Sequence, residues 1–242
     1  MDENINKLNE LIKNSKNIVF FTGAGVSTDS GIPDFRSEDG LYNCLSEYGV
    51  DYETILSSSF FYSKPEIFYD FYKKHMFNLA AKPNYFHKFV ADLEKSKNVI
   101  VVTQNIDGLH SLAGSTNVLE LHGTIYKNKC LKCNKSFDLD YIMNSKPLPI
   151  CDKCGGLIKP EVVLYEESLD MDILYSSINA ISKADLLIIA GTSLKVQPAA
   201  SLIQYYNGRY IIVINKEKLY INSNNIIQIN DSVVNVAKKL KL

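Results

Sequence analysis

The sequence lacks any long apolar run. Its longest apolar segments, such as residues 184–191 of the 242, have the length of a strand, which excludes a membrane-spanning helix. The first 17 residues are polar and charged, and they lack the apolar stretch and small-residue cleavage site of a secretory signal. We therefore expect a cytoplasmic protein that does not enter a membrane.

Neither sign of charge is in excess. The chain has 26 Lys and Arg against 27 Asp and Glu, a formal net charge of -1. Because proteins that bind phosphate backbones are usually basic, we expect no direct nucleic-acid binding. Hydrophobic residues make up 46% and charged residues 22%, ordinary values for a globular protein of one substantial core with room for a small second module.

Cysteine is scarce, and its five copies are unevenly placed. Four of them form two CxxC pairs, Cys130 with Cys133 and Cys151 with Cys154. Each pair can place two thiolates on one ion, and two pairs complete a closed tetrahedral site, so we predict one structural Zn²⁺. Four unrelated buried cysteines are the alternative, but they seldom show this spacing. Cys44 is left over, as a small apolar residue or a surface thiol.

Buried apolar runs alternate with helical patterns along most of the chain. Strands are predicted over residues 17–22, 98–103, 184–190, 209–215 and 226–230. Helices are predicted over residues 2–15, 64–81, 84–96, 170–182, 199–206 and 232–240, and a long loop with short helices over residues 29–65. This order predicts an α/β fold, a Rossmann-type doubly wound parallel sheet with a small zinc-ribbon insertion. The predicted domains are residues 1–126 with 161–242, and the zinc module 127–160.

Gly23-Ala24-Gly25 directly follows the first predicted strand. Glycines there let the backbone approach a pyrophosphate, although the same pattern also forms simple tight turns. A dinucleotide fingerprint would continue with glycine where Thr28 stands, and no second strand ends in an acidic residue about 20 positions later. An ordinary NAD-dependent dehydrogenase therefore fits poorly.

Longer motifs are more specific. The segments 23–36 (GAGVSTDSGIPDFR), 103–110 (TQNIDGLH), 120–124 (ELHGT) and 191–194 (GTSL) resemble the signature motifs of the sirtuin family. The cysteine pairs lie where this family has them, and residues 60–68 are similar to bacterial members. The resemblance extends from about residue 18 to residue 240.

The resemblance implies roles for individual residues. It makes His122 the general base, where a lone histidine would otherwise be read as structural. The cofactor-binding residues that it implies are Gly23, Ala24, Gly25, Ser27, Thr28, Asp34, Phe35, Arg36, Gln104, Asn105, Ile106, Asp107, Gly191, Thr192, Ser193, Asn215, Lys216 and Ser232. Among these, Asn105 and Asp107 also suit the plainer role of capping the next helix.

The resemblance also implies the reaction. In the family, NAD is consumed as a co-substrate, and an acylated lysine of a protein yields nicotinamide, free lysine and O-acyl-ADP-ribose. A neutral imidazole suits the proton removal because its ordinary pKa lies near the working pH. The peptide is expected between residues 160–167 and 194–198, with Val163, Tyr165 and Val196 in contact. The family usually has Phe-Gly where this chain has Tyr165-Glu166, which leaves the peptide contacts open. We expect a monomer.

Acyl selectivity is predicted from two positions. Family members that prefer acidic acyl chains resemble one another in a Tyr-x-x-Arg pair, which aligns with Tyr72 and His75. Arginine binds a carboxylate with two parallel hydrogen bonds, whereas a neutral imidazole offers at most one donor, so we predict that acetyl groups are preferred over succinyl groups. Both residues also suit the plainer role of packing on the helix. Three alternatives to deacylation stay open: protein ADP-ribosylation with NAD, a zinc-ribbon binding module with an inert Rossmann domain, and an NAD-dependent oxidoreductase.

Overall fold

The computed structural model describes residues 2–32, 47–76, 78, 80–221 and 225–241. The described α-helices are α1 (Asp2–Asn14), α3 (Tyr52–Ile55), α4 (Ser58–Ser63), α5 (Pro65–His75), α6 (Tyr85–Leu93), α7 (Leu109–Leu112), α8 (Leu139–Asn144), α9 (Met171–Lys183) and α10 (Val233–Lys239). The 3₁₀ helices are η1 (Ala24–Val26), η2 (Thr28–Ser30) and η3 (Ala199–Tyr205). The strands are β1 (Asn17–Thr22), β2 (Asn98–Thr103), β3 (Val118–Glu120), β4 (Gly123–Cys130), β5 (Ser136–Phe137), β6 (Ile158–Val162), β7 (Leu186–Ala190), β8 (Ile211–Ile214) and β9 (Ile226–Ile229).

The larger sheet is parallel and has six strands in the order β3-β2-β1-β7-β8-β9. The five predicted strands are all present, and β3 is an addition too short to show a pattern in the sequence. From β1 the chain first builds outward through β2 and β3, and later returns to the other side of β1 with β7. The carboxyl ends of β1 and β7 therefore flank the point where the strand order reverses, which is where open α/β sheets bind ligands.

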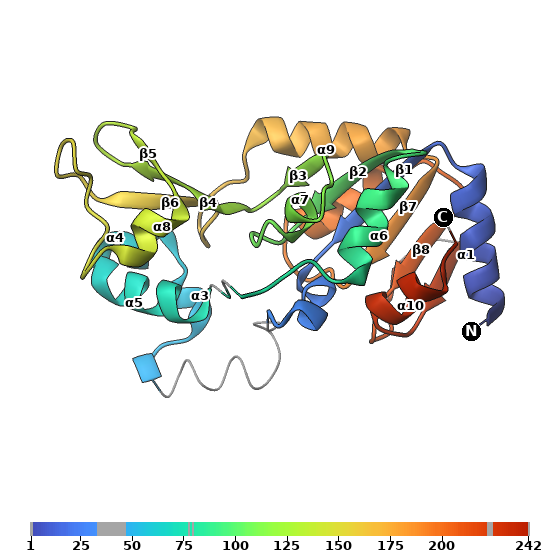
Figure 1. The fold of residues 1–242 in the computed structure, drawn as a ribbon, viewed down its shortest axis with the longest axis horizontal. Helices are drawn as coiled ribbons and strands as arrows, with labels where there is room; N and C mark the ends of the chain where they lie inside the picture. The colour runs from blue at the N-terminus through green and yellow to red at the C-terminus, as the bar shows by residue number, and fades with distance from the viewer. Residues whose placement is uncertain (1, 33–46, 77, 79, 222–224, 242) are drawn as a thin grey trace.

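Helices cover both faces of this sheet (Figure 1). Along β1, Ile18 and Phe20 belong to a buried cluster with α1, α6 and α10. The alternate residues Val19 and Phe21 belong to a second cluster with α9 and η3. Because successive side chains of a strand point to opposite faces, a strand apolar at every position needs such cover on both sides. The predicted α/β fold with a doubly wound parallel sheet is confirmed.

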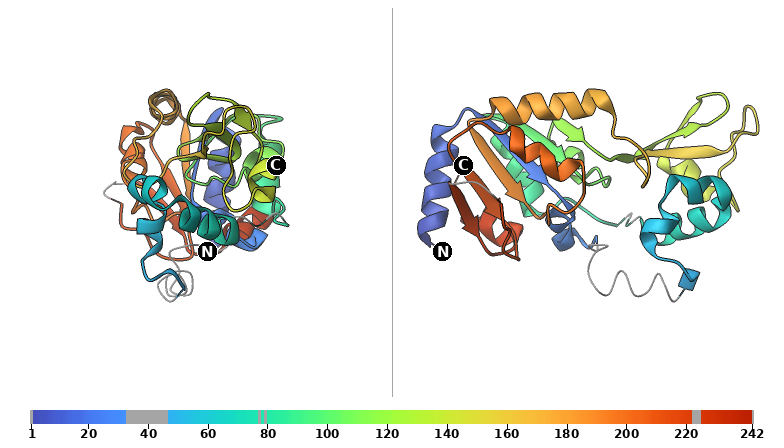
Figure 2. Two further views of the ribbon diagram at one scale, coloured as in Figure 1. Left: turned by 90° about the vertical axis from the view of Figure 1, so that its left-hand side faces the viewer. Right: turned by 180° about the vertical axis from the view of Figure 1, so that it is seen from behind.

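A smaller lobe is built around the antiparallel sheet β5-β4-β6. Figure 1 and the rear view in Figure 2 show α3, α4, α5 and α8 gathered around it, at the opposite end of the molecule from α1 and α10. One buried cluster joins Phe61, Phe68 and Tyr69 of the helices to Phe137 and Ile158 of the cysteine-bearing segment. The small lobe thus draws on two stretches of chain, residues 48–76 and 125–164.

Two predicted helices differ from the structure. The helix expected over residues 64–81 ends at His75. Asn78 Oδ1 then accepts locally from the Ala80 N–H, and its Nδ2 donates to the distant Gly31 O. Such side-chain bonds to the backbone compete with helix formation. The segment 199–206 forms a 3₁₀ helix in place of an α-helix. Within the described ranges, no helix has the length and apolar character needed to cross a membrane.

Candidate active site

A cavity of about 350 Å³ lies between the carboxyl ends of β1, β2 and β7 and the small lobe. From the large sheet it is lined by Gly23, Ala24, Ser27, Ile32, Gln104, Asn105, Ile106, Asp107, His122, Gly191, Thr192, Ser193, Val196, Gln197 and Pro198. From the small lobe and the segment after β6 it is lined by Tyr52, Leu56, Tyr72, Met76, Val162, Val163, Leu164, Tyr165, Glu166, Glu167 and Leu169. Most of the residues expected at the cofactor thus share one cavity.

The glycine-rich turns after β1 and β7 lie against each other. The Gly25 N–H donates a 2.8 Å hydrogen bond to Gly191 O. A side chain at Gly25 would put Cβ 2.7 Å from Gly191 Cα, and Gly191 has φ +58. Glycine is therefore required at both positions for the two turns to pack together, and the packed turns form one wall of the cavity through Gly23, Ala24, Gly191 and Thr192.

Ser27, Asn105 and Asp107 form a hydrogen-bonded group on the cavity wall. Ser27 Oγ donates to Asp107 Oδ2 at 2.6 Å and accepts from Asn105 Nδ2 at 3.0 Å. Asp107 Oδ1 accepts from the Leu109 N–H at 2.9 Å, so Asp107 also has the capping role considered from the sequence. Burial raises the pKa of Asp107, while the bonds from Ser27 and Leu109 oppose that shift. A carboxylate held in this way can accept a hydrogen bond from a bound amide.

His122 lies in the turn between β3 and β4, on the side of the cavity nearer the small lobe. Its Nδ1 is 2.8 Å from the carbonyl oxygen of Gln104. Since a carbonyl only accepts, Nδ1 carries the proton, and the basic lone pair of the neutral ring is on Nε2. The His122 carbonyl accepts from the Val163 N–H at 2.9 Å, which fixes the backbone of this turn. The ring is thus oriented as a base.

The second wall is the segment that follows β6. Tyr165 N–H donates to Leu56 O, and Tyr165 O accepts from the Ser58 N–H, so this segment pairs with the chain around Ser57. Val163 and Tyr165 lie on this wall, and Val196 lies across the cavity in the segment after β7. The three residues expected at the substrate therefore come from two facing segments.

Several expected residues lie elsewhere. Thr28 Oγ1 donates to Gly25 O within its own turn, Asn215 Nδ2 donates to Glu217 O, and Ser232 caps α10. With Gly25 and Lys216, they are not among the described residues that line the cavity. Asp34, Phe35 and Arg36 lie outside the described residues.

The pair expected to read the acyl group is separated. Tyr72 is fully buried and lines the cavity. His75 lies one turn later on α5, where its ring packs against Tyr48 and Phe71 and its Nε2 is 3.5 Å from a Glu47 carboxylate oxygen. The structure therefore does not bring His75 to the cavity, and the packing role considered from the sequence describes its surroundings.

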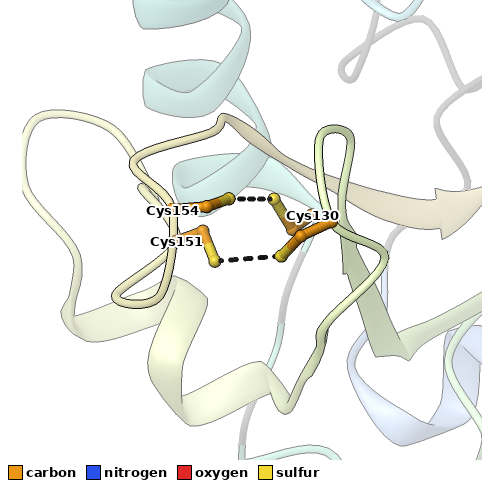
Figure 3. A group of neighbouring side chains, drawn as sticks. Cys130, Cys151 and Cys154 are labelled. Carbon is orange, nitrogen blue, oxygen red and sulfur yellow. Dashed lines mark hydrogen bonds between the residues drawn. The ribbon is translucent and has the colours of Figure 1, made fainter.

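The four cysteines of the small lobe meet at one point (Figure 3). Cys130 Sγ is 3.5 Å from Cys154 Sγ, and Cys133 Sγ is 3.7 Å from Cys151 Sγ. In a tetrahedral site with Zn–S bonds of about 2.3 Å the sulfur atoms are roughly 3.8 Å apart, so this cluster can hold one zinc ion. Four protein ligands leave no open position, which makes the site structural.

The sequence did not indicate much of the small-lobe wall. Tyr52, Leu56 and Met76 reach the cavity from segments read as loop or helix, without a chemical motif. Glu166 and Glu167 lie in a segment expected at the peptide, but neither was assigned a role. The signal in the sequence was the glutamate at 166 where the resemblance implies glycine, which left the peptide contacts open; nothing comparable marked Glu167.

Known proteins are similar to this chain in sequence and in fold. The NAD-dependent protein deacetylase of Clostridium tetani is 54% identical over 228 residues, 93% of this chain and 92% of the relative. The enzyme of the same name from Clostridium perfringens is 52% identical over 242 residues, 99% of each chain.

Solved structures of Sir2 proteins are similar to this chain in fold. A Sir2 complex with a p53 peptide and NAD+ has a TM-score of 0.85 at 38% identity, covering 97% of this chain and 96% of that one. A Sir2 complex with a deacetylated p53 peptide and 3'-O-acetyl-ADP-ribose has a TM-score of 0.87 at 37% identity, with the same coverage. Residues 23–198, which hold the glycine turns, His122 and the four cysteines, match the Sir2 family. The chain belongs to the Sir2 family, the sirtuins.

Proposed function

We propose that this protein is an NAD-dependent protein-lysine deacetylase that produces nicotinamide, free lysine and O-acetyl-ADP-ribose. The observation that carries the proposal is the bond between His122 Nδ1 and Gln104 O. It leaves the basic Nε2 on a ring that lines the same cavity as the glycine turns and the Asp107 group. The relatives named NAD-dependent protein deacetylase support the same activity.

NAD is a co-substrate in this proposal, and it supplies an activated bond between nicotinamide and ribose. The glycine-rich turn after β1 and the turn after β7 hold its phosphates at the cavity, where Gly23, Ala24, Gly191 and Thr192 line the wall. Asn105 and Asp107 receive the nicotinamide amide, and Ser27 holds Asp107 in place through their 2.6 Å bond. His122 Nε2 removes the proton from the ribose hydroxyl that takes up the acyl group.

The acylated peptide lies between the segment after β6 and the segment after β7. Val163, Tyr165 and Val196 contact it there, and its main chain adds as a strand between the two segments. The acyl group points toward the wall at Tyr72, beside the apolar side chains of Leu56 and Met76. Because none of these wall residues carries a charge, a neutral acetyl group is preferred over succinyl.

A product analysis tests the activity. The protein is incubated with labelled NAD and an acetyl-lysine peptide, and the products are identified by mass spectrometry. We expect equal amounts of nicotinamide, deacetylated peptide and O-acetyl-ADP-ribose. Label that accumulates on protein would indicate ADP-ribosyl transfer instead, and formation of NADH would indicate an oxidoreductase.

We further propose that the protein acts as a cytoplasmic monomer without direct nucleic-acid binding. The near-neutral net charge of -1 supports the last point. We also propose that residues 127–160 form a separate zinc module on the NAD-binding domain, extended by residues 48–76, which share its buried cluster. Light scattering on the purified protein tests the monomer.

A further inference from the structure

Glu166 has an unusual backbone conformation at the mouth of the cavity. Its φ is +74, in the left-handed region that favours glycine. The residue lines the cavity, and its side chain is exposed to solvent. A non-glycine residue stays in this region only where contacts with its surroundings hold it there.

Ser59 supplies those contacts. Glu166 Oε2 accepts from the Ser59 N–H and Oε1 accepts from Ser59 Oγ, both at 2.9 Å. The adjacent Tyr165 carbonyl accepts from the Ser58 N–H at 2.9 Å, so the segment is anchored at two successive residues. The carboxylate is therefore fixed in position beside the proposed peptide path.

This carboxylate has hydrogen-bond donors in the first turn of α4 but no cationic partner among the described residues. Its neighbour Glu167 pairs with Lys159 at 3.0 Å, but Glu166 forms no ion pair with any residue that the structure describes. Across the cavity, the lining residues of the segment after β7 are all uncharged: Gly191, Thr192, Ser193, Val196, Gln197 and Pro198. Lys195 of this segment is exposed and is not among the lining residues. A peptide between the two segments thus passes a fixed negative charge and, among the described lining residues, no Lys or Arg.

We propose that Glu166 determines substrate specificity: it favours acyl-lysine peptides with a cationic side chain next to the modified lysine and disfavours those with an acidic one. The inference rests on the proposed deacetylase function and names the class of peptide that the site takes. Unit charges about 7 Å apart in water change binding by a factor of about 2 to 3, so the cation-to-anion contrast should reach about fivefold or more. Raising the salt concentration should reduce it.

The test uses acetyl-lysine peptides that differ at one position beside the modified lysine, which is Lys, Gln or Glu. For the wild type, kcat/KM should fall in the order Lys, Gln, Glu, with at least about a fivefold difference between the ends. Glu166→Gln removes the charge but keeps both Ser59 contacts, because its amide NH2 can donate to Ser59 Oγ while its carbonyl accepts the N–H. In this variant the ratio should fall to about twofold or less.

Glu66→Gln is the matched control, since it removes the same charge from an exposed residue of α5 that does not line the cavity. Its Lys-to-Glu ratio should equal that of the wild type. An unchanged ratio in Glu166→Gln would overturn the inference. If Glu166→Gln does not fold, the salt dependence of the wild type provides the test. A Lys-to-Glu ratio of kcat/KM that does not change with salt concentration contradicts the role of charge. Failure of the wild type to deacetylate any of the peptides would instead refute the proposed function.

Discussion

Ser27 Oγ donates a 2.6 Å hydrogen bond to Asp107 Oδ2, and this bond joins the turn after β1 to the turn after β2. The two residues come from separate motifs of the sequence. Their contact orients a partly buried carboxylate whose pKa is raised by desolvation.

Removing this carboxylate should slow the first chemical step of the proposed reaction, in which the bond between nicotinamide and ribose breaks. In Asp107→Asn, an amide NH2 takes the place of one carboxylate oxygen, either the one that faces Ser27 or the one that faces Leu109. The negatively charged acceptor for the nicotinamide amide is then lost. Hydrogen bonds to charged groups contribute about 1.5–3 kcal/mol, so nicotinamide exchange should slow by roughly 10- to 100-fold. Exchange of labelled nicotinamide into NAD measures this. Asp29→Asn, an exposed residue of η2, is the control and should exchange normally.

His122→Ala should lower the kcat of deacetylation by about 10²- to 10⁴-fold, the usual contribution of a general base. Nicotinamide exchange should fall less, because bond cleavage at the ribose does not need that base. His75→Ala provides the comparison, since His75 lies on α5 away from the cavity. If His122→Ala deacetylated the peptide at the wild-type rate, His122 would not be the general base.

Zinc removal should destabilise the small lobe. Cys130→Ser removes one of four ligands, and because metal binding contributes folding energy, Tm should fall by about 10 °C or more together with the zinc content. Metal analysis and a thermal melt measure both. Cys44→Ser, outside the two CxxC pairs, should keep its zinc. Full zinc content and an unchanged Tm in Cys130→Ser would contradict a structural site.

The buried His87 should make the large domain sensitive to acid. Burial lowers the pKa of His87 from 6.5 to about 4, and His110, 4.7 Å away between ring centroids, is shifted the same way by burial and by His87. The unfolded chain therefore takes up a proton at a higher pH than the folded protein does. The stability from the neutral ring is present above pH 6.5 and is lost as the pH falls toward 4, by roughly 3 kcal/mol.

Urea unfolding at several pH values tests this. His87→Gln is less stable at pH 7, because the buried ring that accepts from the Asn84 N–H is replaced. Its free energy of unfolding should nevertheless decline less steeply than that of the wild type between pH 6.5 and pH 4. Equal slopes for the two proteins would show that His87 does not titrate in this range.

Features that depend on short stretches of sequence could be predicted without the structure. The apolar runs at residues 17–22 and 98–103 could only be strands covered on both faces, and they are β1 and β2. The CxxC spacing at Cys130 and Cys151 dictated a common metal site, because two residues between thiols already place them on one ion. The turn at Gly23–Gly25 could be predicted because two glycines directly follow a predicted strand.

Which residues line the same cavity became clear only from the tertiary structure. Tyr72 and His75 are three positions apart, yet only Tyr72 lines it, because the packing of α5 turns one face inward and leaves His75 beside Glu47. Glu166 and Ser59 are 107 residues apart, and no local pattern links them. Such contacts depend on how segments far apart in the sequence pack against each other, and residue spacing does not show this.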